Sequence, residues 1–312
     1  MVYKQQIKTV SDGMLVRAPA KINLSLLIAG RRDDGFHEIE TLMAKVNLYD
    51  EILIQQGTKK GIEVVSEGAY WAPQGSENLV YKACETLMEN TGTSPNIKIT
   101  LTKNIPAGSG LGSASSDAAA TLIGVNKYLR LNIPTGLPDS SENKYEGINL
   151  QQMAARLGSD IAFFLDGPLA FCTGKGEKIK KIHKNFPFLA LLILPDVSVS
   201  TKKVYANYKH DPKLYSSLKS KINGYIQKNR FDSLSKMCAN MLQICCFNLH
   251  KEFAVLKAEI ESIGIGPVCL SGSGSSMFII LGGTEEDKAR QYKQKVEQKI
   301  GCNTVIVSNN RW

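Results

Sequence analysis

The sequence has no apolar run long enough to cross a bilayer, and its first residues, Met-Val-Tyr-Lys-Gln-Gln-Ile-Lys, lack the apolar core of a secretion signal. Its 7 cysteines form no Cys-x-x-Cys pair and have no regular spacing, so the sequence indicates neither a zinc site nor a disulfide framework. Tandem repeats and low-complexity tracts are absent as well. From these absences we expect a soluble cytoplasmic protein with reduced thiols and no membrane partner.

The composition is that of an ordinary globular protein. A length of 312 residues and a hydrophobic content of 43% allow two domains with a substantial core. The net charge of +9 favours an anionic partner, which could be a nucleotide, a nucleic acid or a membrane surface. The basic run 175–184 has few aromatic residues, which favours a solvated face over a nucleic-acid groove. We place the domain boundary beside this run, between residues 1–185 and 186–312.

The order of apolar patterns predicts α+β domains. Alternation over 14–28 indicates a strand, and turn residues 30–35 separate it from the next. The other expected strands are 36–42, 50–56, 62–65, 97–103, 189–195 and 303–307, and the expected helices include 78–89, 149–156 and 285–299. Segment 133–147 is rich in Pro, Gly and Ser, and we assign it no function. Runs of strands and helices, without a regular βαβ series, are typical of the α+β class.

The most informative stretch is P-A-G-S-G-L-G-S-A-S-S-D-A-A-A, residues 106–120, between a predicted strand and a predicted helix. Its three glycines allow a tight turn and a close approach of the backbone to a ligand. The helix start offers free N–H groups and a positive dipole end, which Asp117 in the first turn would suit. Hydroxyls of Ser113, Ser115 and Ser116 could bind phosphate or a metal. A capped connection without a ligand is the alternative, but three glycines and four serines in eleven residues exceed what a cap requires.

This loop does not match the two best-known nucleotide motifs. No Gly-Lys-Ser/Thr follows the glycines, so it is not a Walker loop. Ser113 replaces the third glycine of a dinucleotide fingerprint, and no acidic residue follows at the distance that the ribose contact requires. The loop therefore predicts phosphate binding without specifying a reaction.

Phosphoryl transfer needs a phosphate cradle, charge compensation and a group that positions the acceptor hydroxyl. Gly272-Ser-Gly-Ser275 could supply further backbone N–H groups, although it could also be only a glycine-rich hairpin. Lys21 follows a proline, and Asp160 lies in a Gly-Ser-Asp turn. On the residues alone, Lys21 could be a surface lysine and Asp160 a helix cap. If they meet at an acceptor hydroxyl, Asp160 would accept its proton and Lys21 would orient it and offset negative charge.

Five segments resemble, in order, the motifs of the GHMP small-molecule kinases. They are A-P-A-K-I-N-L-S-L, G-R-R-D-D-G-F-H-E-I-E-T-L, the loop 106–120, L-G-S-D-I-A-F-F-L and L-S-G-S-G-S-S-M-F. The resemblance implies a two-domain α+β fold with the active site between the domains. It also implies ATP, used as its Mg²⁺ complex, as the cofactor, while the sequence identifies no dedicated metal ligand. We expect no nucleic-acid partner and a monomer or weak homodimer.

The resemblance assigns functions to particular residues. Lys21 and Asp160 match the family's catalytic lysine and aspartate. The ATP-binding loop comprises Pro106, Ala107, Gly108, Ser109, Gly110, Leu111, Gly112, Ser113, Ala114, Ser115 and Ser116. The substrate-binding residues are Asn23, Phe36, His37, Tyr205, Gly272 and Ser273.

Two segments, D-G-F-H-E-I-E-T-L and the Gly-Ser-Asp turn followed by G-P-L-A-F-C-T-G-K-G-E, resemble one group within this family. These kinases phosphorylate the 2-hydroxyl of a methylerythritol alcohol linked to cytidine diphosphate, in the non-mevalonate route to isoprenoid precursors. Phe36 and His37 match the pair that holds the cytosine, and Tyr205 is expected to face them. Without the resemblance, Phe36 would be interpreted as a core residue and His37 as a surface histidine.

Two departures from the family pattern affect the expected binding. The family usually has tyrosine where Phe36 stands, so stacking is kept but a phenol hydrogen bond is lost. Ser109, Ser113 and Ala114 replace glycines and stiffen the loop. The alternatives are a GHMP kinase of mevalonate or homoserine type, which needs no cytosine site, and a basic nucleic-acid-binding protein.

Overall fold

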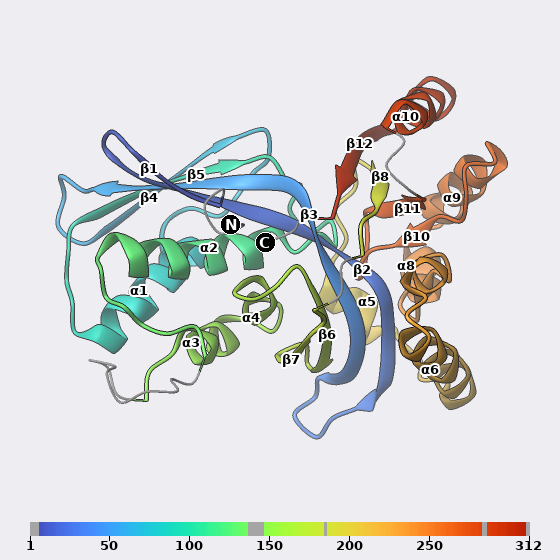
Figure 1. Ribbon diagram of the computed structural model, residues 1–312, viewed down its shortest axis with the longest axis horizontal. Coiled ribbons are helices and arrows are strands. Elements are labelled where there is room, and N and C mark those ends of the chain that lie inside the picture. The colour runs from blue at the N-terminus through green and yellow to red at the C-terminus, as the bar shows by residue number, and fades with distance from the viewer. Residues whose placement is uncertain (1–5, 137–146, 184–185, 283–285, 310–312) are drawn as a thin grey trace.

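The computed structural model describes residues 6–136, 147–183, 186–282 and 286–309, so most of segment 133–147 lies outside the described residues. These residues form two β-sheets with helices beside each (Figure 1). None of the described helices combines the length and the apolar character that a membrane crossing requires. The mixture of sheets and separate helices is the α+β class predicted above.

A long antiparallel hairpin of the first sheet also contacts the second, where an isolated bridge pairs Val46 with Asn309 beyond β12. Its strands are β2 (Gly13–Arg31) and β3 (His37–Gln56), paired from Gly13 opposite Gln55 to Arg31 opposite His37. The prediction of two separate strands at 36–42 and 50–56 is wrong, because β3 continues through the residues between them. Residues 43–46 are buried and pair with β2, and the register shifts at Pro19/Ala20 and Asn23/Ser25 on either side of them are local irregularities within one continuous strand. In Figure 1 the two long strands cross the middle of the view and bend downward beside β6 and β7.

The first sheet contains β1, β2, β3, β5 and β4 in that order. In addition, β6 pairs with β3, β7 pairs with β6 and β9 pairs with β2. The bounds are β1 (Ile7–Val10), β4 (Ile62–Gly68), β5 (Ile97–Lys103), β6 (Leu169–Gly174), β7 (Lys178–Lys181) and β9 (Ala239–Asn240). Four helices lie on one side of this sheet in Figure 1: α1 (Leu79–Thr91), α2 (Ser113–Tyr128), α3 (Leu150–Leu157) and α4 (Ile161–Phe164). The short 3-10 turn η2 (Gly75–Glu77) precedes α1, which begins where the Asn78 side chain accepts from the Val80 N–H.

The second sheet is antiparallel, in the order β10, β11, β8, β12. Its strands are β8 (Leu189–Leu194), β10 (Cys269–Leu270), β11 (Met277–Leu281) and β12 (Asn303–Ser308). The helices of this half are α5 (Thr201–Ala206), α6 (Pro212–Gln227), α7 (Phe231–Ser235), α8 (Gln243–Leu249), α9 (Glu252–Ser262) and α10 (Glu286–Ile300). The strands predicted at 189–195 and 303–307 and the C-terminal helix are confirmed.

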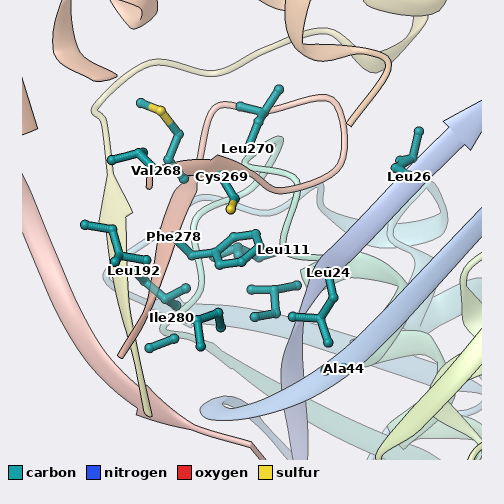
Figure 2. Packing of buried hydrophobic residues seen from close by; sticks show 14 of the residues in the cluster. Leu24, Leu26, Ala44, Leu111, Leu192, Val268, Cys269, Leu270, Phe278 and Ile280 are labelled. Atoms are coloured by element: carbon teal, nitrogen blue, oxygen red, sulfur yellow. The ribbon is translucent and has the colours of Figure 1, made fainter. Parts of the chain in front are cut away.

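One hydrophobic cluster contains residues from both sheets. Leu24 and Ala44 of the hairpin belong to the same cluster as Phe278 and Leu192 of the second sheet, with Leu111 of the glycine-rich loop (Figure 2). Burying this apolar surface stabilises the arrangement of the two halves. The matching second cluster lies between the first sheet and helices α1 to α4.

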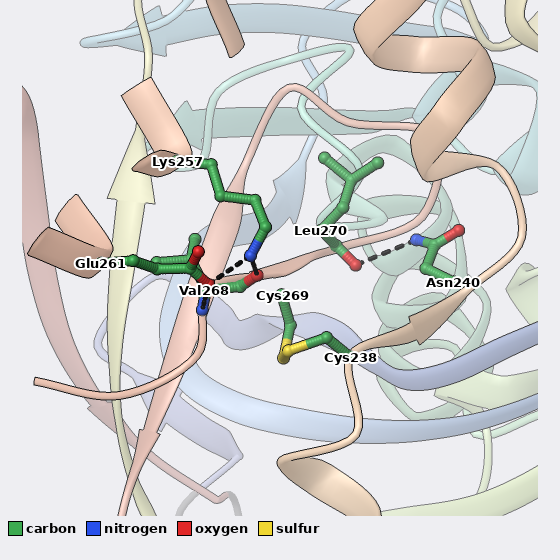
Figure 3. Close-up of a disulfide and its surroundings, with 7 residues drawn as sticks. All are labelled: Cys238, Asn240, Lys257, Glu261, Val268, Cys269 and Leu270. Carbon is green, nitrogen blue, oxygen red and sulfur yellow. Dashed lines mark hydrogen bonds and ion pairs between the residues drawn. A yellow bond between two sulfur atoms is a disulfide. The ribbon is translucent and has the colours of Figure 1, made fainter. Parts of the chain in front are cut away.

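A disulfide joins Cys238, just before β9, to Cys269 of β10 (Figure 3). The prediction that all the thiols are reduced is therefore wrong. The two Cα atoms are 4.6 Å apart, although 31 positions separate them in the sequence. Tertiary structure brings these cysteines together, so no local spacing pattern could indicate the bond.

Candidate active site

A cleft of about 1050 Å³ lies between the hairpin, the glycine-rich loop, the turn before α4, helix α5 and the second Gly/Ser loop. All predicted catalytic and substrate residues line it: Lys21, Asn23, Phe36, His37, Asp160, Tyr205, Gly272 and Ser273. Loop residues 106–110 and 112–115 line it too, whereas Leu111 and Ser116 are buried. The fold thus gathers into one cavity residues that are far apart in the sequence.

Lys21 and Asp160 meet in this cleft, with 3.6 Å between Lys21 Nζ and Asp160 Oδ2. Lys21 is only 4% exposed, so it is not a surface lysine. Asp160 precedes α4, but its side chain makes no capping hydrogen bond to the described residues of the helix. The two simpler interpretations of these residues are therefore wrong. Burial lowers the pKa of Lys21, and the Asp160 carboxylate opposes that shift.

A chain of hydrogen bonds orients Lys21. Its ammonium donates to Asn23 Oδ1 at 2.5 Å, and Asn23 Nδ2 donates to the Thr41 hydroxyl at 2.8 Å. The Thr41 hydroxyl in turn donates to the Ser25 carbonyl at 2.7 Å. Both the oxygen and the nitrogen of the Asn23 amide are thus hydrogen-bonded within the protein. Sequence analysis missed Thr41, although it lies within the segment E-I-E-T-L that carried the resemblance.

Gly112 allows the glycine-rich loop to pack against Lys21. It precedes α2 with φ 71°, a conformation that favours glycine. A Cβ there would lie 2.9 Å from Cζ of Phe164 and 3.0 Å from Cγ of Lys21. The Lys21 N–H also donates to the Leu111 carbonyl at 2.9 Å. The phosphate loop predicted from the sequence therefore contacts the strand that carries Lys21.

The two Gly/Ser loops interlock through their backbones. A Cβ on Gly110 would overlap the carbonyl oxygen of Ser271. The Ser271 hydroxyl donates to the Gly110 carbonyl at 3.0 Å, and the Ser276 N–H donates to the Ser109 carbonyl at 2.9 Å. These contacts require glycine at position 110 and fix both loops at the same edge of the cleft.

Asn240 and Thr201 hold the second loop from the other side. Asn240 Nδ2 donates to the carbonyls of Leu270 at 3.0 Å and Gly272 at 2.8 Å, the first of which Figure 3 shows. The Ser273 and Thr201 hydroxyls are 2.8 Å apart, and both residues line the cleft. Gly272 and Ser273 thus form a fixed part of its wall.

A buried ionic cluster lies under the start of α2. Lys103 pairs with Asp50 and, at 2.7 Å, with Asp117, and the Ser113 hydroxyl donates to Asp50 at 2.8 Å. The prediction that Asp117 lies in the first turn of the helix is wrong, since it lies one turn further and is buried. Burial raises the pKa of Asp117 well above its usual range, and Lys103 opposes the shift. The cluster anchors the base of the glycine-rich loop.

Aromatic side chains form the end of the cleft near the hairpin turn. The centroid of the His37 ring is 5.2 Å from that of Tyr205 and 5.7 Å from that of Tyr208. Phe36 is 58% exposed, so it is not a core residue, and Lys175 Nζ lies 4.7 Å from its ring centroid. Tyr205 faces His37 rather than Phe36.

Sequence analysis missed Tyr208, which follows Tyr205 by three residues and lines the same cleft. Burial raises the pKa of Tyr208 to about 12 and also raises that of Tyr205. Burial and the nearby Arg31 lower the pKa of His37, so its neutral ring is favoured. The His37, Tyr205 and Tyr208 side chains are therefore neutral and suited to stacking, while Arg31 and Lys175 place positive charge beside them.

The chain is similar to known kinases in both sequence and fold. A family model described as the GHMP kinases N terminal domain matches residues 78–167, and the GHMP kinases C terminal model matches 222–300. Proteins named 4-diphosphocytidyl-2-C-methyl-D-erythritol kinase from Bacillus cereus strain B4264 and Bacillus anthracis strain CDC 684 are each 34% identical to the chain over 265 residues. In both cases the alignment covers 85% of this chain and 87% of the relative.

Solved structures give the same result. The crystal structure of a 4-(cytidine 5'-diphospho)-2C-methyl-D-erythritol kinase matches with a TM-score of 0.72 at 28% identity, covering 96% of this chain and all of that one. A homoserine kinase from Cytophaga hutchinsonii matches with a TM-score of 0.71 at 22% identity, over 97% of this chain and 96% of that one, which shows a shared fold. The chain belongs to the 4-diphosphocytidyl-2-C-methyl-D-erythritol kinase family of the GHMP kinases.

Proposed function

We propose that the chain transfers a phosphoryl group from ATP to the 2-hydroxyl of 4-diphosphocytidyl-2-C-methyl-D-erythritol, a step of the non-mevalonate route to isoprenoid precursors. The observation that carries this proposal is the Lys21–Asp160 pair, which lies in one cleft with the glycine-rich loop and the aromatic residues around His37. The names of the relatives support the choice of acceptor.

Asp160 is proposed as the general base and Lys21 as the group that orients the acceptor oxygen. The Asp160 side chain makes no cap with the described part of α4, so its carboxylate can accept a proton from a bound hydroxyl. The buried ammonium of Lys21 lies beside it and can offset the negative charge that develops during transfer. Phosphoryl transfer depends mainly on such positioning and electrostatics.

The glycine-rich loop is proposed to hold the ATP phosphates. Backbone N–H groups of residues 108–113 and the start of α2 are suited to anions, and the glycines keep Cβ atoms out of the way. Mg²⁺ bound to ATP would neutralise phosphate charge. Ser115, which is partly exposed and lines the cleft, offers the most accessible hydroxyl of the helix start for this complex. The Asp117 carboxylate is already paired with Lys103.

The acceptor is proposed to bind with its cytosine at the aromatic end of the cleft. Phe36 presents an exposed ring for stacking, and His37 offers a neutral imidazole for hydrogen bonding, with Tyr205 against it. Asn23 lines the cleft beside Lys21, although its amide is engaged with Lys21 and Thr41. Gly272 and Ser273 would contact the transferring phosphoryl group.

We further propose a cytoplasmic enzyme, a monomer or weak homodimer without a nucleic-acid partner, with domains 1–185 and 186–312. The positive net charge, +9, suits the anionic nucleotide and acceptor.

The proposed function is tested by measuring ADP release with three alcohols: 4-diphosphocytidyl-2-C-methyl-D-erythritol, mevalonate and homoserine. We expect ADP only with the first. Absence of ADP with that acceptor would defeat the proposal, and ADP with mevalonate or homoserine instead would support the alternative GHMP activity.

Replacement of the proposed base gives a test of the mechanism. We expect Asp160→Ala to reduce kcat by ~10²–10⁴-fold, because it removes general-base catalysis. Asp196→Ala, which removes an exposed carboxylate outside the cleft, serves as the matched control and should retain wild-type kcat. Near-normal turnover of Asp160→Ala would exclude the assigned function of this residue.

A further inference from the structure

Lys45 is a buried lysine to which the phosphoryl transfer proposed for Lys21 and Asp160 assigns no role. It is 1% exposed, and on β3 it lies directly opposite Lys21 of β2. Residues directly opposite each other in an antiparallel pair point to the same face of the sheet. Two lysines of the hairpin therefore project together towards α4, the four-residue helix that follows Asp160.

The ammonium of Lys45 binds the C-terminal end of α4. Its Nζ donates to the carbonyl of Phe164 at 3.0 Å and to the carbonyl of Asp166. Carbonyls at a helix end have no partner within the helix, so these donors satisfy groups that burial would otherwise leave unpaired. A lysine has two N–H groups even when neutral, enough for both carbonyls.

The N-terminal end of α4 lies next to the proposed catalytic pair, Lys21 and Asp160. Asp160 immediately precedes the helix and lies 3.6 Å from Lys21, as described above. Because α4 has only one turn, a movement of its last residue is transmitted to its first. The ring of Phe164 also packs beneath Gly112, beside the side chain of Lys21.

We propose that Lys45 is a positioning residue for the phosphoryl transfer: by holding the Phe164 and Asp166 carbonyls, it fixes Asp160 at its working distance from Lys21. The two lysines hold the two ends of one short helix. This inference rests on the function proposed for Asp160. A displacement of about 1 Å at a reacting group can reduce a rate by about 10²-fold, so a remote anchor of this kind has a measurable effect.

A double-mutant cycle tests the inference. We expect Lys45→Met to reduce kcat per active site by about 10- to 100-fold, with little change in KM for ATP. Because Lys45 acts through Asp160, the double variant Lys45→Met/Asp160→Asn should be no slower than Asp160→Asn alone. Effects that multiply would overturn the inference and leave the proposed function intact. Wild-type kcat in Asp160→Asn would instead overturn the general-base role of Asp160, and the inference with it, while the proposed kinase activity would stand.

A control and a second measurement separate positioning from simple loss of stability. Lys293→Met removes a lysine on α10 that also donates to a carbonyl, that of Thr304 at 2.5 Å, and should lower stability without changing kcat per active site. If Lys45→Met does not fold, Lys45→Gln keeps an amide NH2 group near the two carbonyls and should show a smaller loss of kcat. A crystal structure of the folded variant should show a Lys21 Nζ to Asp160 Oδ2 distance above 3.6 Å. An unchanged distance would overturn the inference.

Discussion

At the scale of single residues, the cleft depends on buried polar groups that are each held by named partners. Lys21 has Asn23 and Asp160, and Asn23 has Thr41. Breaking such a chain lowers the free energy of unfolding, because each buried donor left without an acceptor destabilises the fold by about 1–3 kcal/mol.

Thr41 offers the simplest test of this chain. We expect Thr41→Val to reduce kcat by about ten-fold, equivalent to about 1.4 kcal/mol, because Asn23 loses its acceptor and Lys21 its fixed position. Thr41→Ser keeps the hydroxyl and should restore most of the activity. Steady-state kcat and KM for both substrates check this, and equal kcat in the valine and serine variants would contradict it.

The burial of Lys45 leads us to expect that the stability of the protein depends on pH. Burial lowers its pKa to about 7, although the Asp166 carboxylate raises it, whereas an unfolded chain has the ordinary value of 10.5. Between these values the unfolded chain binds the proton that the folded chain lacks, so the contribution of Lys45 to the free energy of unfolding increases from pH 7 towards 10.5.

Urea unfolding of wild type and Lys45→Met between pH 6 and 10 measures this contribution. We expect the difference in unfolding free energy, wild type minus variant, to increase with pH over that interval. Lys293→Met, which lacks a half-buried lysine on α10, gives the reference slope. A constant difference would show that Lys45 stays protonated in the folded protein.

At the scale of elements, the site is made by two loops that share a backbone interface. The patterns of Gly and Ser predicted both loops, and the strands and helices around them, because glycine spacing and apolar alternation are local signals. Their contact at Gly110 and Ser271 could not be predicted, since it depends on where the second sheet packs. The same holds for Asp117, whose burial is decided by Lys103 and Asp50 on neighbouring strands.

Gly110→Ala tests the loop interface. The added methyl group would overlap the Ser271 carbonyl, and φ at this residue is 78°, which disfavours alanine. We expect KM for ATP to rise by about ten-fold or more, corresponding to at least about 1.4 kcal/mol of lost binding. Gly224→Ala in α6, which has open space around it, should leave KM unchanged and stabilise the helix by about 0.5–1 kcal/mol.

At the scale of the whole molecule, long-range connections were the least predictable features. The continuous β3 was missed because residues 43–49 include polar and charged positions that resemble a break. Lys45 is one of these residues, and only the position of α4 explains why a lysine is buried there. Cys238 and Cys269 likewise have no relation visible in the sequence, because β9 and β10 meet only in the folded chain.

The disulfide predicts a dependence of stability on reducing agent. Closing a loop of 31 positions should stabilise the fold by about 3–4 kcal/mol in the chain-entropy model. We expect Cys269→Ser, or reduction of the wild type, to lower the urea midpoint accordingly, and Cys302→Ser, which removes a free thiol, to have little effect. Seven titratable thiols in the unreduced, denatured protein would contradict the bond.

The β2–β3 hairpin also has a consequence for how the chain folds. Its strands are made early in synthesis, yet the Met241 N–H donates to the Leu26 carbonyl at 2.9 Å, and the Ser308 N–H donates to Asn47 Oδ1 at 2.7 Å. The hairpin therefore completes its hydrogen bonding and buries its apolar face only after residues more than two hundred positions later have emerged. Contacts of such long sequence separation slow folding, and the nascent hairpin exposes an edge on which other chains can aggregate. We expect residues 1–185 expressed alone to aggregate instead of folding as an independent unit.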